Sequence, residues 1–586
     1  MPRIILCSFL ALAAATGVAA DQAVAPALPG PRAAQADVAG GGASPAKSAP
    51  AKITLGEQET IVIYGDSITE QSLYSALLET FFVSRFPHRK IATFNFGWGG
   101  DTASGGHKRF ARDVAPEAPT LVFVNFGMND GGYKAFDEAV YQRYLESQDQ
   151  LADDIAAIGA REVLFTASPV DDVLRGDGGV YNETLAKLAA GLIDFAGRRH
   201  IPVIDLYGPM LEIQREAKAK NPDFTMIPDT IHPNLVGHLV MTYLALRQIE
   251  APHTIGEIVV GEERVQGSDG AQISNVEVKE GDVVFDLDLP FLPFYVPPEA
   301  RPALDLVPFE RELNRFVLRV PDAAGDKPWA VSADGITLGT FRSDELAQGI
   351  DLAVLEKAPW TVAGRLLWQA AQYRWTKHQE AWRLMGIERP AMMLPDLPTF
   401  EPFMKAQRAH ADAMGHALQS LAQPGHYRVR VSLQGAPIPV SSVLLSPTYP
   451  FQGDFDHAWP PETDPEDVAW RPAPFVDGHI DLGGQFTQST DVVAYARMDL
   501  EADSPCALDL SMGSDDGLAV FANGKRLFAH DVMRSLRRGE DEVEVPLQKG
   551  RNVLLFKVTQ AGGGWELAVE ARARGKAKVW PSTDQK

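Results

Sequence analysis

Hydrophobic and polar positions follow two different patterns along this chain. The stretch Ile61–Ile68, IVIYGDSI, opens with four apolar or aromatic residues and no polar alternation. Thr120–Phe126, TLVFVNF, is apolar throughout except for Asn125. Continuous apolar runs of this length predict strands that are buried on both faces, as in a parallel sheet covered by helices. The first pattern therefore indicates an α/β domain near the N-terminal end.

The same region alternates between strands and helices. A helix with apolar residues at helical spacing is predicted to stop at Gly159, since glycine is a common C-cap. Such alternation indicates βαβ crossovers, and so a three-layer α/β/α domain with a parallel, flavodoxin-like sheet over residues 52–254. The predicted strands are 60–64, 90–96, 120–126, 162–167 and 201–206, and the predicted helices are 72–86, 136–158, 183–198 and 235–249.

Residues 255–440 have a mixed pattern. Short strands are predicted at 258–260, 283–289 and 315–320, followed by two long helical stretches, 359–384 and 402–421, with a Pro-rich break at 389–398. We expect a helical hairpin beside the first domain. Its aromatic side chains fit either of two interpretations, a substrate cleft or ordinary packing, since large rings dominate cores. They are Trp360, Trp368, Tyr373, Trp375 and Trp382.

The C-terminal part has a second pattern, of short strands separated by turn signals. Asn523-Gly524 and Lys549-Gly550 are two such signals. This spacing predicts a β-sandwich over residues 469–580, with residues 441–468 as a linker that wraps around it. At 586 residues the chain is too long for a single core, which agrees with several domains.

The N-terminal residues predict the compartment. Arg3 precedes an apolar run from Ile4 to Ala19, and Val18-Ala19-Ala20 fits a small-residue cleavage site. We interpret residues 1–20 as a signal peptide that exports the protein to the periplasm or the outside of the cell, and residues 21–51, rich in Ala, Pro and Gly, as a disordered linker. Cys7 would leave with the signal peptide, so Cys506 could form no intrachain disulfide.

Charge narrows the possible partners. Lys+Arg total 54 against Asp+Glu 77, a formal net charge of -23. Such a surface repels phosphate backbones, so nucleic acid is not an expected partner. No later segment is long and apolar enough to predict a membrane span.

Candidate chemistry gathers where the predicted strands end. Ser67 follows the first strand, the glycine-dense FNFGWGGDT (94–102) follows the second, and Asn129 follows the third. Asp229 and His232 lie three apart, just before the last helix of the domain. Each has an ordinary interpretation as a turn or cap residue. Their conjunction at one sheet edge, where α/β domains bind ligands, instead predicts a reaction site.

This set resembles the SGNH (GDSL-type) hydrolase family, whose four sequence blocks occur here in order. GDSI at 65–68 matches the nucleophile block, the NxGxxGDT pattern at 95–102 the second, GMND at 127–130 the third and DTIHPN at 229–234 the fourth. The resemblance covers residues 58–250. It implies an ester hydrolase without a cofactor or a metal.

The resemblance also implies roles for individual residues. Ser67 attacks the ester carbonyl, His232 is the general base and then acid, and Asp229 orients the imidazole. The oxyanion would meet the Ser67 and Gly100 N–H groups and the Asn129 amide, although Gly97 and Gly99 are alternative donors. Asp66 and Asp130 are expected to orient loops through backbone hydrogen bonds.

Two further sets of residues have alternative interpretations. Asp66, Asp130, Asp229 and His232 could form a metal site for phosphoester hydrolysis, although such sites usually have more ligands. The segment Met512–Phe528, MGSDDGLAVFANGKRLF, resembles the jelly-roll modules of protective-antigen-type lectins. That resemblance makes Asp515 and Asp516 weak calcium candidates; alternatively, the pair only caps a strand turn.

The sequence thus predicts an exported serine esterase that removes acetyl or other short acyl groups from carbohydrate, with acetylated polysaccharide as a possible substrate. A lipase, lysophospholipase or thioesterase of the same family is the first alternative. A non-catalytic polysaccharide-binding protein is the second. The loop Asp171–Val180 and the middle region are expected to determine specificity.

Overall fold

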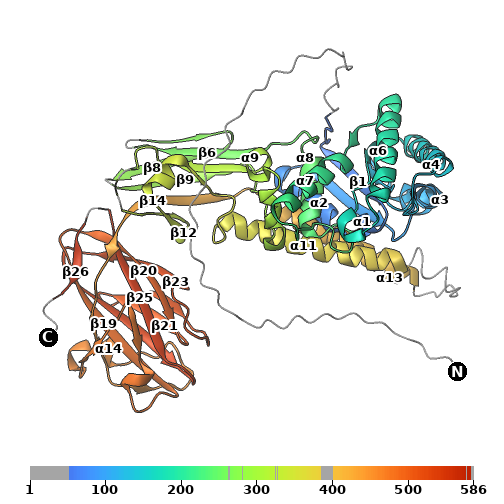
Figure 1. Ribbon diagram of the computed structural model, residues 1–586. Coiled ribbons are helices and arrows are strands. Elements are labelled where there is room, and N and C mark those ends of the chain that lie inside the picture. Colours follow the sequence, from blue (N-terminus) through green and yellow to red (C-terminus); the bar gives the residue numbers. More distant parts are fainter. Residues whose placement is uncertain are drawn as a thin grey trace, which may run out of the picture. The chain divides into compact units, whose positions relative to one another are not determined.

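The computed structural model describes residues 52–261, 264–279, 281–323, 325, 327–384, 400–575 and 577–582 (Figure 1). The predicted signal peptide and linker, residues 1–51, and the predicted Pro-rich break at 389–398 lie outside these ranges.

A five-stranded parallel sheet forms the centre of the first domain. Its order is β2-β1-β3-β4-β5, which is the flavodoxin-like order predicted from the sequence. Four consecutive side chains of β1, Ile61–Tyr64, are fully buried, as expected for a strand with helices on both faces. The strands are β1 (Gln58–Gly65), β2 (Lys90–Gly97), β3 (Leu121–Asn125), β4 (Arg161–Phe165) and β5 (Val203–Ile204).

Helices cover the two faces of this sheet. On one face α2 packs against α8, and on the other α3, α4 and α6 pack in succession (Figure 1). The short helix α1 (Ser67–Glu70) follows β1 directly. The remaining helices are α2 (Leu73–Arg85), α3 (Ala103–Asp113), α4 (Glu138–Ala157), α5 (Asp172–Arg175), α6 (Val180–Arg199), α7 (Tyr207–Lys220) and α8 (Leu235–Leu246).

Helices α3 and α7 were not predicted from the sequence. Helix α3 contains Gly105 and Gly106, which have low helix propensity, and α7 has Gly208 and Pro209 in its first turn. Gly106 is required by packing, because a Cβ there would lie 2.6 Å from the Phe126 ring. Tertiary contacts therefore outweigh propensity in these two helices.

The middle region combines two small groups of strands with a pair of long helices. The predicted strands correspond to β6, β9 and β10, whereas β7, β8, β11, β12, β13 and β14 (His426–Pro437) were not predicted. The strands are β6 (Thr254–Val260), β7 (Val265–Ser268), β8 (Gln272–Lys279), β9 (Asp282–Asp288), β10 (Arg315–Arg319), β11 (Trp329–Ala333), β12 (Ile336–Phe341) and β13 (Ile350–Asp351), with short helices α9 (Phe309–Leu313) and α10 (Ser343–Gln348).

The two long helices, α11 (Pro359–Arg383) and α13 (Phe400–Leu421), pack on each other and on α2. Helix α11 also contacts β2, so the predicted helical pair does lie beside the α/β domain. Four tryptophans of α11, Trp360, Trp368, Trp375 and Trp382, are buried, whereas Tyr373 is half exposed. The packing interpretation is thus confirmed for the tryptophans.

The C-terminal part forms two antiparallel sheets around a separate apolar core. One sheet has the order β17-β15-β19-β24-β21-β22, with β16 and β26 also paired to β19, and the other contains β18, β25, β20 and β23. The strands are β14 (His426–Pro437), β15 (Ser442–Leu445), β16 (Tyr449–Pro450), β17 (Arg471–Pro474), β18 (His479–Asp481), β19 (Val492–Ala502), β20 (Cys506–Ser514), β21 (Leu518–Ala522), β22 (Lys525–His530), β23 (Asp541–Leu547), β24 (Gly550–Gln560), β25 (Glu566–Arg574) and β26 (Val579–Pro581).

The strand pairing begins before residue 469. Strands β15 and β16 lie within the predicted linker 441–468, and both pair with β19. Prolines and acidic residues interrupt any alternation of apolar and polar positions in this segment. Phe455, from the same segment, is buried in a small cluster with Val493 and Tyr495 of β19, so the segment packs on the sheet as well as wrapping it.

Among the helices of the described ranges, none combines the length and the apolar character that a bilayer span requires.

Burial of Glu162 on β4 makes stability depend on pH. Neither carboxylate oxygen has a hydrogen-bond partner among the described residues, and burial raises the pKa of Glu162 to about 8, against the opposing charge of Arg199. The pKa of this side chain in the unfolded chain is about 4.3. Between about pH 4.3 and about pH 8, Glu162 is therefore protonated in the folded state and ionised in the unfolded state, so the free energy of unfolding falls as pH rises.

We expect Glu162→Gln to become progressively more stable than the parent as pH rises from 5 to 9, by on the order of 2 to 4 kcal/mol at pH 9. Chemical denaturation at several pH values measures this difference, and the exposed Glu183→Gln on α6 is the control. A stability difference that does not change with pH would contradict the burial argument.

Candidate active site

The serine predicted as nucleophile lies at the sharp junction of β1 and α1. Gly65 ends the strand, and a Cβ there would lie 2.3 Å from Thr69 Oγ1 and 2.4 Å from the Asn125 carbonyl oxygen, so only glycine fits. Asp66 is the N-cap of α1, and its Oδ1 accepts the Ile68 N–H at 3.0 Å. Ser67 is thereby held at the first position of α1, at the carboxyl edge of the sheet.

His232 and Asp229 reach this serine from the segment before α8. The Ser67 hydroxyl donates to His232 Nε2 at 2.8 Å, and His232 Nδ1 is 2.6 Å from Asp229 Oδ2. The aspartate accepts the Nδ1 proton, which leaves Nε2 as the acceptor for the serine proton. The structure therefore brings together the three residues, 165 positions apart, that the sequence predicted as a triad.

Backbone geometry fixes the Asp229 carboxylate. Its Oδ1 accepts the N–H groups of Ile231 at 3.0 Å and His232 at 2.7 Å. Burial alone would raise the pKa of Asp229, but these two N–H groups and the His232 ring outweigh it and hold the pKa below its usual value. Asp229 is thus ionised at neutral pH and stabilises an imidazolium at His232.

The glycine-dense loop after β2 supplies candidate oxyanion donors. The Gly97 N–H donates to Asn95 Oδ1 at 2.8 Å, which removes Gly97 from the three candidate glycines. Gly100 has φ +75, a conformation that favours glycine, and a Cβ there would meet no atom within 4 Å. Within the described ranges the Ser67 and Gly100 N–H groups have no acceptor.

The third predicted donor, Asn129, follows β3. Its Nδ2 donates one hydrogen to the Asp101 carbonyl oxygen at 2.8 Å, which ties the GMND turn to the glycine loop. An amide nitrogen carries two hydrogens, so one remains for a ligand. Asp130 accepts the Ala103 N–H at 3.0 Å. Asp66 and Asp130 thus make the structural backbone bonds predicted for them.

The alternative metal site is not supported by these residues. Burial raises the pKa of Asp66 to about 8 and that of Asp130 to about 7, so the Asp66 carboxyl favours the neutral form near pH 7 and the Asp130 carboxyl is only partly ionised there. In the part of the chain that the structure describes, no group of three or more His, Cys, Asp or Glu is placed to hold a metal ion.

The weak calcium candidates in the sandwich also make other bonds. Asp516 is buried, and its carboxylate oxygens accept the N–H groups of Arg534 at 3.2 Å and Ala561 at 2.9 Å. Its neighbour Asp515 has a raised pKa because of burial and the nearby charges of Asp516 and Glu566. The geometry fits the alternative interpretation, in which the pair caps a strand turn.

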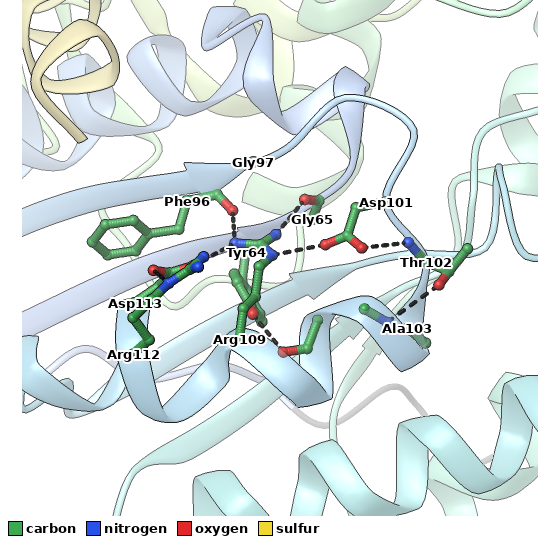
Figure 2. A network of polar contacts seen from close by, with 12 residues as sticks. Tyr64, Gly65, Phe96, Gly97, Asp101, Thr102, Ala103, Arg109, Arg112 and Asp113 are labelled. Atoms are coloured by element: carbon green, nitrogen blue, oxygen red, sulfur yellow. Dashed lines mark hydrogen bonds and ion pairs between the residues drawn. The ribbon is translucent and has the colours of Figure 1, made fainter. Parts of the chain in front are cut away.

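A buried arginine that was not singled out from the sequence connects the strand ends (Figure 2). Arg109, on α3, donates to the carbonyl oxygens of Gly65 at 3.1 Å and Phe96 at 2.8 Å, and to Asp101 Oδ2 at 2.7 Å. Its guanidinium lies 4.3 Å from the centre of the Tyr64 ring. A planar, five-donor group is suited to such a junction. Arg109 thus joins the nucleophile turn to the glycine loop.

Helix α11 supports the same loop from outside the α/β domain. The Trp382 ring packs edge-on against Phe96 and Trp98, with ring centres 5.4 Å and 5.9 Å apart. Gln379 Nε2 donates at 3.0 Å to Asn95 Oδ1, the atom that also accepts the Gly97 N–H. These contacts are between residues almost 300 positions apart, so no local sequence signal could have indicated them.

The part of the chain that carries this geometry is similar to a known family. Residues 63–240 match the model of the GDSL-like lipase/acylhydrolase family. The match includes all five residues of the predicted site. No curated protein matches the chain.

One solved structure shows a shared fold, and two others have lower similarity. A gut microbial diltiazem-metabolizing enzyme has 24% identity and a TM-score of 0.59, with 65% of this chain and 99% of that chain covered. The acetylxylan esterase Axe2 from Geobacillus stearothermophilus has 19% identity and a TM-score of 0.28, with 32% of this chain and 93% of that chain covered. A lipase/acylhydrolase from Enterococcus faecalis has 25% identity and a TM-score of 0.26, with 32% of this chain and 94% of that chain covered.

We expect Arg109→Lys to lower kcat by about 10- to 100-fold, because an ammonium cannot bridge the two carbonyls and the loop shifts. Stability should fall by about 2 kcal/mol. Arg112→Lys is the control. Arg112, like Arg109, pairs with Asp113, but the Arg112 side chain is half exposed. Ester hydrolysis and thermal unfolding measure both effects. Equal behaviour of the two variants would refute the bridging role.

Removal of the packing contact between Trp382 of α11 and the glycine loop should also affect the active site. Trp382→Ala is expected to lower stability by about 3 kcal/mol and to reduce kcat, since the glycine loop loses its packing partner. Tyr373→Ala, on the exposed side of the same helix, should change stability and kcat only slightly. An unaltered kcat in Trp382→Ala would show that α11 does not position the loop.

Proposed function

We propose that the protein is an exported serine esterase that removes acetyl or other short acyl groups from carbohydrate, because residues 63–240 match the model of the GDSL-like lipase/acylhydrolase family. The observation that carries the esterase chemistry is the continuous hydrogen-bonded series from Ser67 through His232 to Asp229. The substrate class rests on the polar surroundings of the site and on the accessory sandwich.

The proposed reaction has two halves. His232 Nε2 takes the proton of the Ser67 hydroxyl as Oγ attacks the ester carbonyl, and the imidazolium then gives that proton to the departing alcohol. Water, deprotonated by the same nitrogen, attacks the acyl-enzyme and releases the acid and Ser67. Asp229 stabilises the imidazolium in both halves.

The negative oxygen that forms in each half needs donors. We assign the backbone N–H groups of Ser67 and Gly100 and the free Asn129 Nδ2 hydrogen to this role. Loss of one such donor typically costs about 3 to 4 kcal/mol in the transition state.

The groups that flank the site favour a polar substrate. Glu70 ends the helix that Ser67 begins, and it forms an ion pair with Arg383. The Arg383 guanidinium lies 5.0 Å from the centre of the Trp98 ring. The side chains of Asp229 and His232 are 56% and 30% exposed, so the catalytic groups open toward solvent. An open rim of charged and aromatic groups suits a hydroxylated leaving group better than a long acyl chain.

Export is proposed from the N-terminal sequence pattern alone. A tagged full-length chain expressed in a bacterium should be found outside the cytoplasm, shortened by about 20 residues at its N-terminus. A chain of full length that stays inside the cell would refute export and leave the esterase proposal intact.

Ser67→Ala should abolish hydrolysis of 4-nitrophenyl acetate without a change in thermal unfolding, because the hydroxyl is the attacking group. Ser104→Ala, on the neighbouring helix α3, is the control and should keep full activity. Activity retained in Ser67→Ala would overturn the nucleophile assignment.

Acyl length separates the proposal from its alternatives. We expect kcat/KM to be highest for acetyl esters and to fall steadily from butanoyl to decanoyl esters of 4-nitrophenol, and acetate to be released from acetylated xylan or another acetylated polysaccharide. A maximum at eight or more carbons would favour a lipase. No hydrolysis at any length, together with retention on a polysaccharide column, would favour a binding protein.

A further inference from the structure

Asn129 has a second partner, Tyr133, that was not singled out from the sequence and that lies outside the GMND pattern. The Tyr133 hydroxyl is 2.6 Å from Asn129 Oδ1. Burial, followed by the nearby charges of Asp66 and Asp229, raises the pKa of Tyr133 to about 12, against the opposing charge of Arg175. The hydroxyl therefore stays protonated at neutral pH and donates to the amide oxygen.

Counting hydrogens on the Asn129 amide shows what this bond does. The amide oxygen accepts from Tyr133, and one Nδ2 hydrogen goes to the Asp101 carbonyl oxygen at 2.8 Å. A flipped amide would place its oxygen against the Asp101 carbonyl oxygen and lose that bond, although its nitrogen could still donate to the Tyr133 hydroxyl. The two partners together fix the orientation in which the second Nδ2 hydrogen is free.

The backbone at Tyr133 is strained. Its φ is +58, a left-handed conformation that bulky residues rarely adopt. Such conformations cost free energy and persist where the surrounding structure enforces them, often at active sites. In this case the Gly132 N–H donates to the Asn129 carbonyl oxygen at 3.0 Å and closes the turn.

The side chain of Tyr133 is held on two further sides. Its ring packs on Tyr181, with ring centres 5.0 Å apart, and the Arg175 guanidinium lies 5.5 Å from its centre. Arg175 belongs to the loop 171–180, whose first N–H, from Asp171, donates to the Thr230 carbonyl oxygen at 3.1 Å. The loop thus contacts both Tyr133 and the segment that carries Asp229 and His232.

We propose that Tyr133 is a positioning residue of the esterase, which orients the Asn129 amide so that one of its hydrogens meets the oxyanion. The inference rests on the proposed function and goes beyond it by adding a residue that acts through Asn129 without touching substrate. It assigns the loop 171–180 a second task, that of holding Tyr133, in addition to any contact with substrate.

A double-mutant cycle tests the inference, with 4-nitrophenyl acetate as substrate. Tyr133→Phe should lower kcat by about tenfold or more while KM changes less than about twofold, because the oxyanion exists only in the transition state. Asn129→Ala should lose more. Tyr133→Phe in the Asn129→Ala background should cause no further loss, because its effect passes through the missing amide.

Two controls separate positioning from stability. Tyr243→Phe removes a similar bond, from Tyr243 to Glu312 Oε2 at 2.7 Å, and should leave kcat unchanged. Inhibition by a boronic acid, which forms a tetrahedral adduct on the serine, should weaken in Tyr133→Phe in proportion to the loss of kcat/KM. Equal thermal unfolding of Tyr133→Phe and the parent shows that the fold is intact.

The outcomes are distinct. Full kcat in Tyr133→Phe, or losses that multiply in the double variant, would overturn this inference alone. Full kcat in Asn129→Ala would overturn both the oxyanion assignment and the inference, while the nucleophile assignment would still stand on Ser67→Ala.

Discussion

Parallel strands that share one sheet deliver their carboxyl ends to the same edge, and the site depends on this constraint. Strands β1, β2 and β3 are adjacent in the order β2-β1-β3. The turns after them are therefore neighbours in space, although the strands end at residues 65, 97 and 125 of the chain. Ser67 follows the central strand of the three, between the glycine loop and Asn129. The segment before α8 then needs only to place His232 beside Ser67, at 2.8 Å.

The chain holds this edge in place with charged groups that are out of water. Arg109 connects the turns after β1 and β2, and Arg374 of α11 pairs with Glu79 of α2 while donating to the Thr93 carbonyl oxygen of β2 at 2.7 Å. Removal of one partner from such a buried pair leaves the other charge uncompensated, which is strongly destabilising. The middle region therefore contributes to the rigidity of the site, and it does so from outside the residues that match the family model.

The sequence predicted those parts of the fold and the site that follow from local patterns. The apolar run of β1 predicted a fully buried strand, and the four short blocks predicted Ser67, Asn129, Asp229 and His232, which the structure brings together with Gly100 still a candidate donor. Helix α3 was missed because it contains two glycines, one of which, Gly106, packs against Phe126. Arg109 and Tyr133 were missed, and Trp382 was named only as a packing or cleft residue, because their significance lies in contacts that only the folded chain creates. Strands β15 and β16 precede residue 469, and they are too short, at four and two residues, to produce an alternating pattern.

The central claim is that His232 and Asp229 activate the Ser67 hydroxyl at this sheet edge. Covalent trapping tests it most directly: the purified protein is treated with a fluorophosphonate, and the modified peptide is identified by mass spectrometry while the rate of labelling is followed. The account predicts one phosphonyl group per chain, attached to Ser67, and a rate that falls by orders of magnitude in His232→Ala. Labelling at another residue, or labelling of Ser67 at an equal rate in His232→Ala, would contradict it.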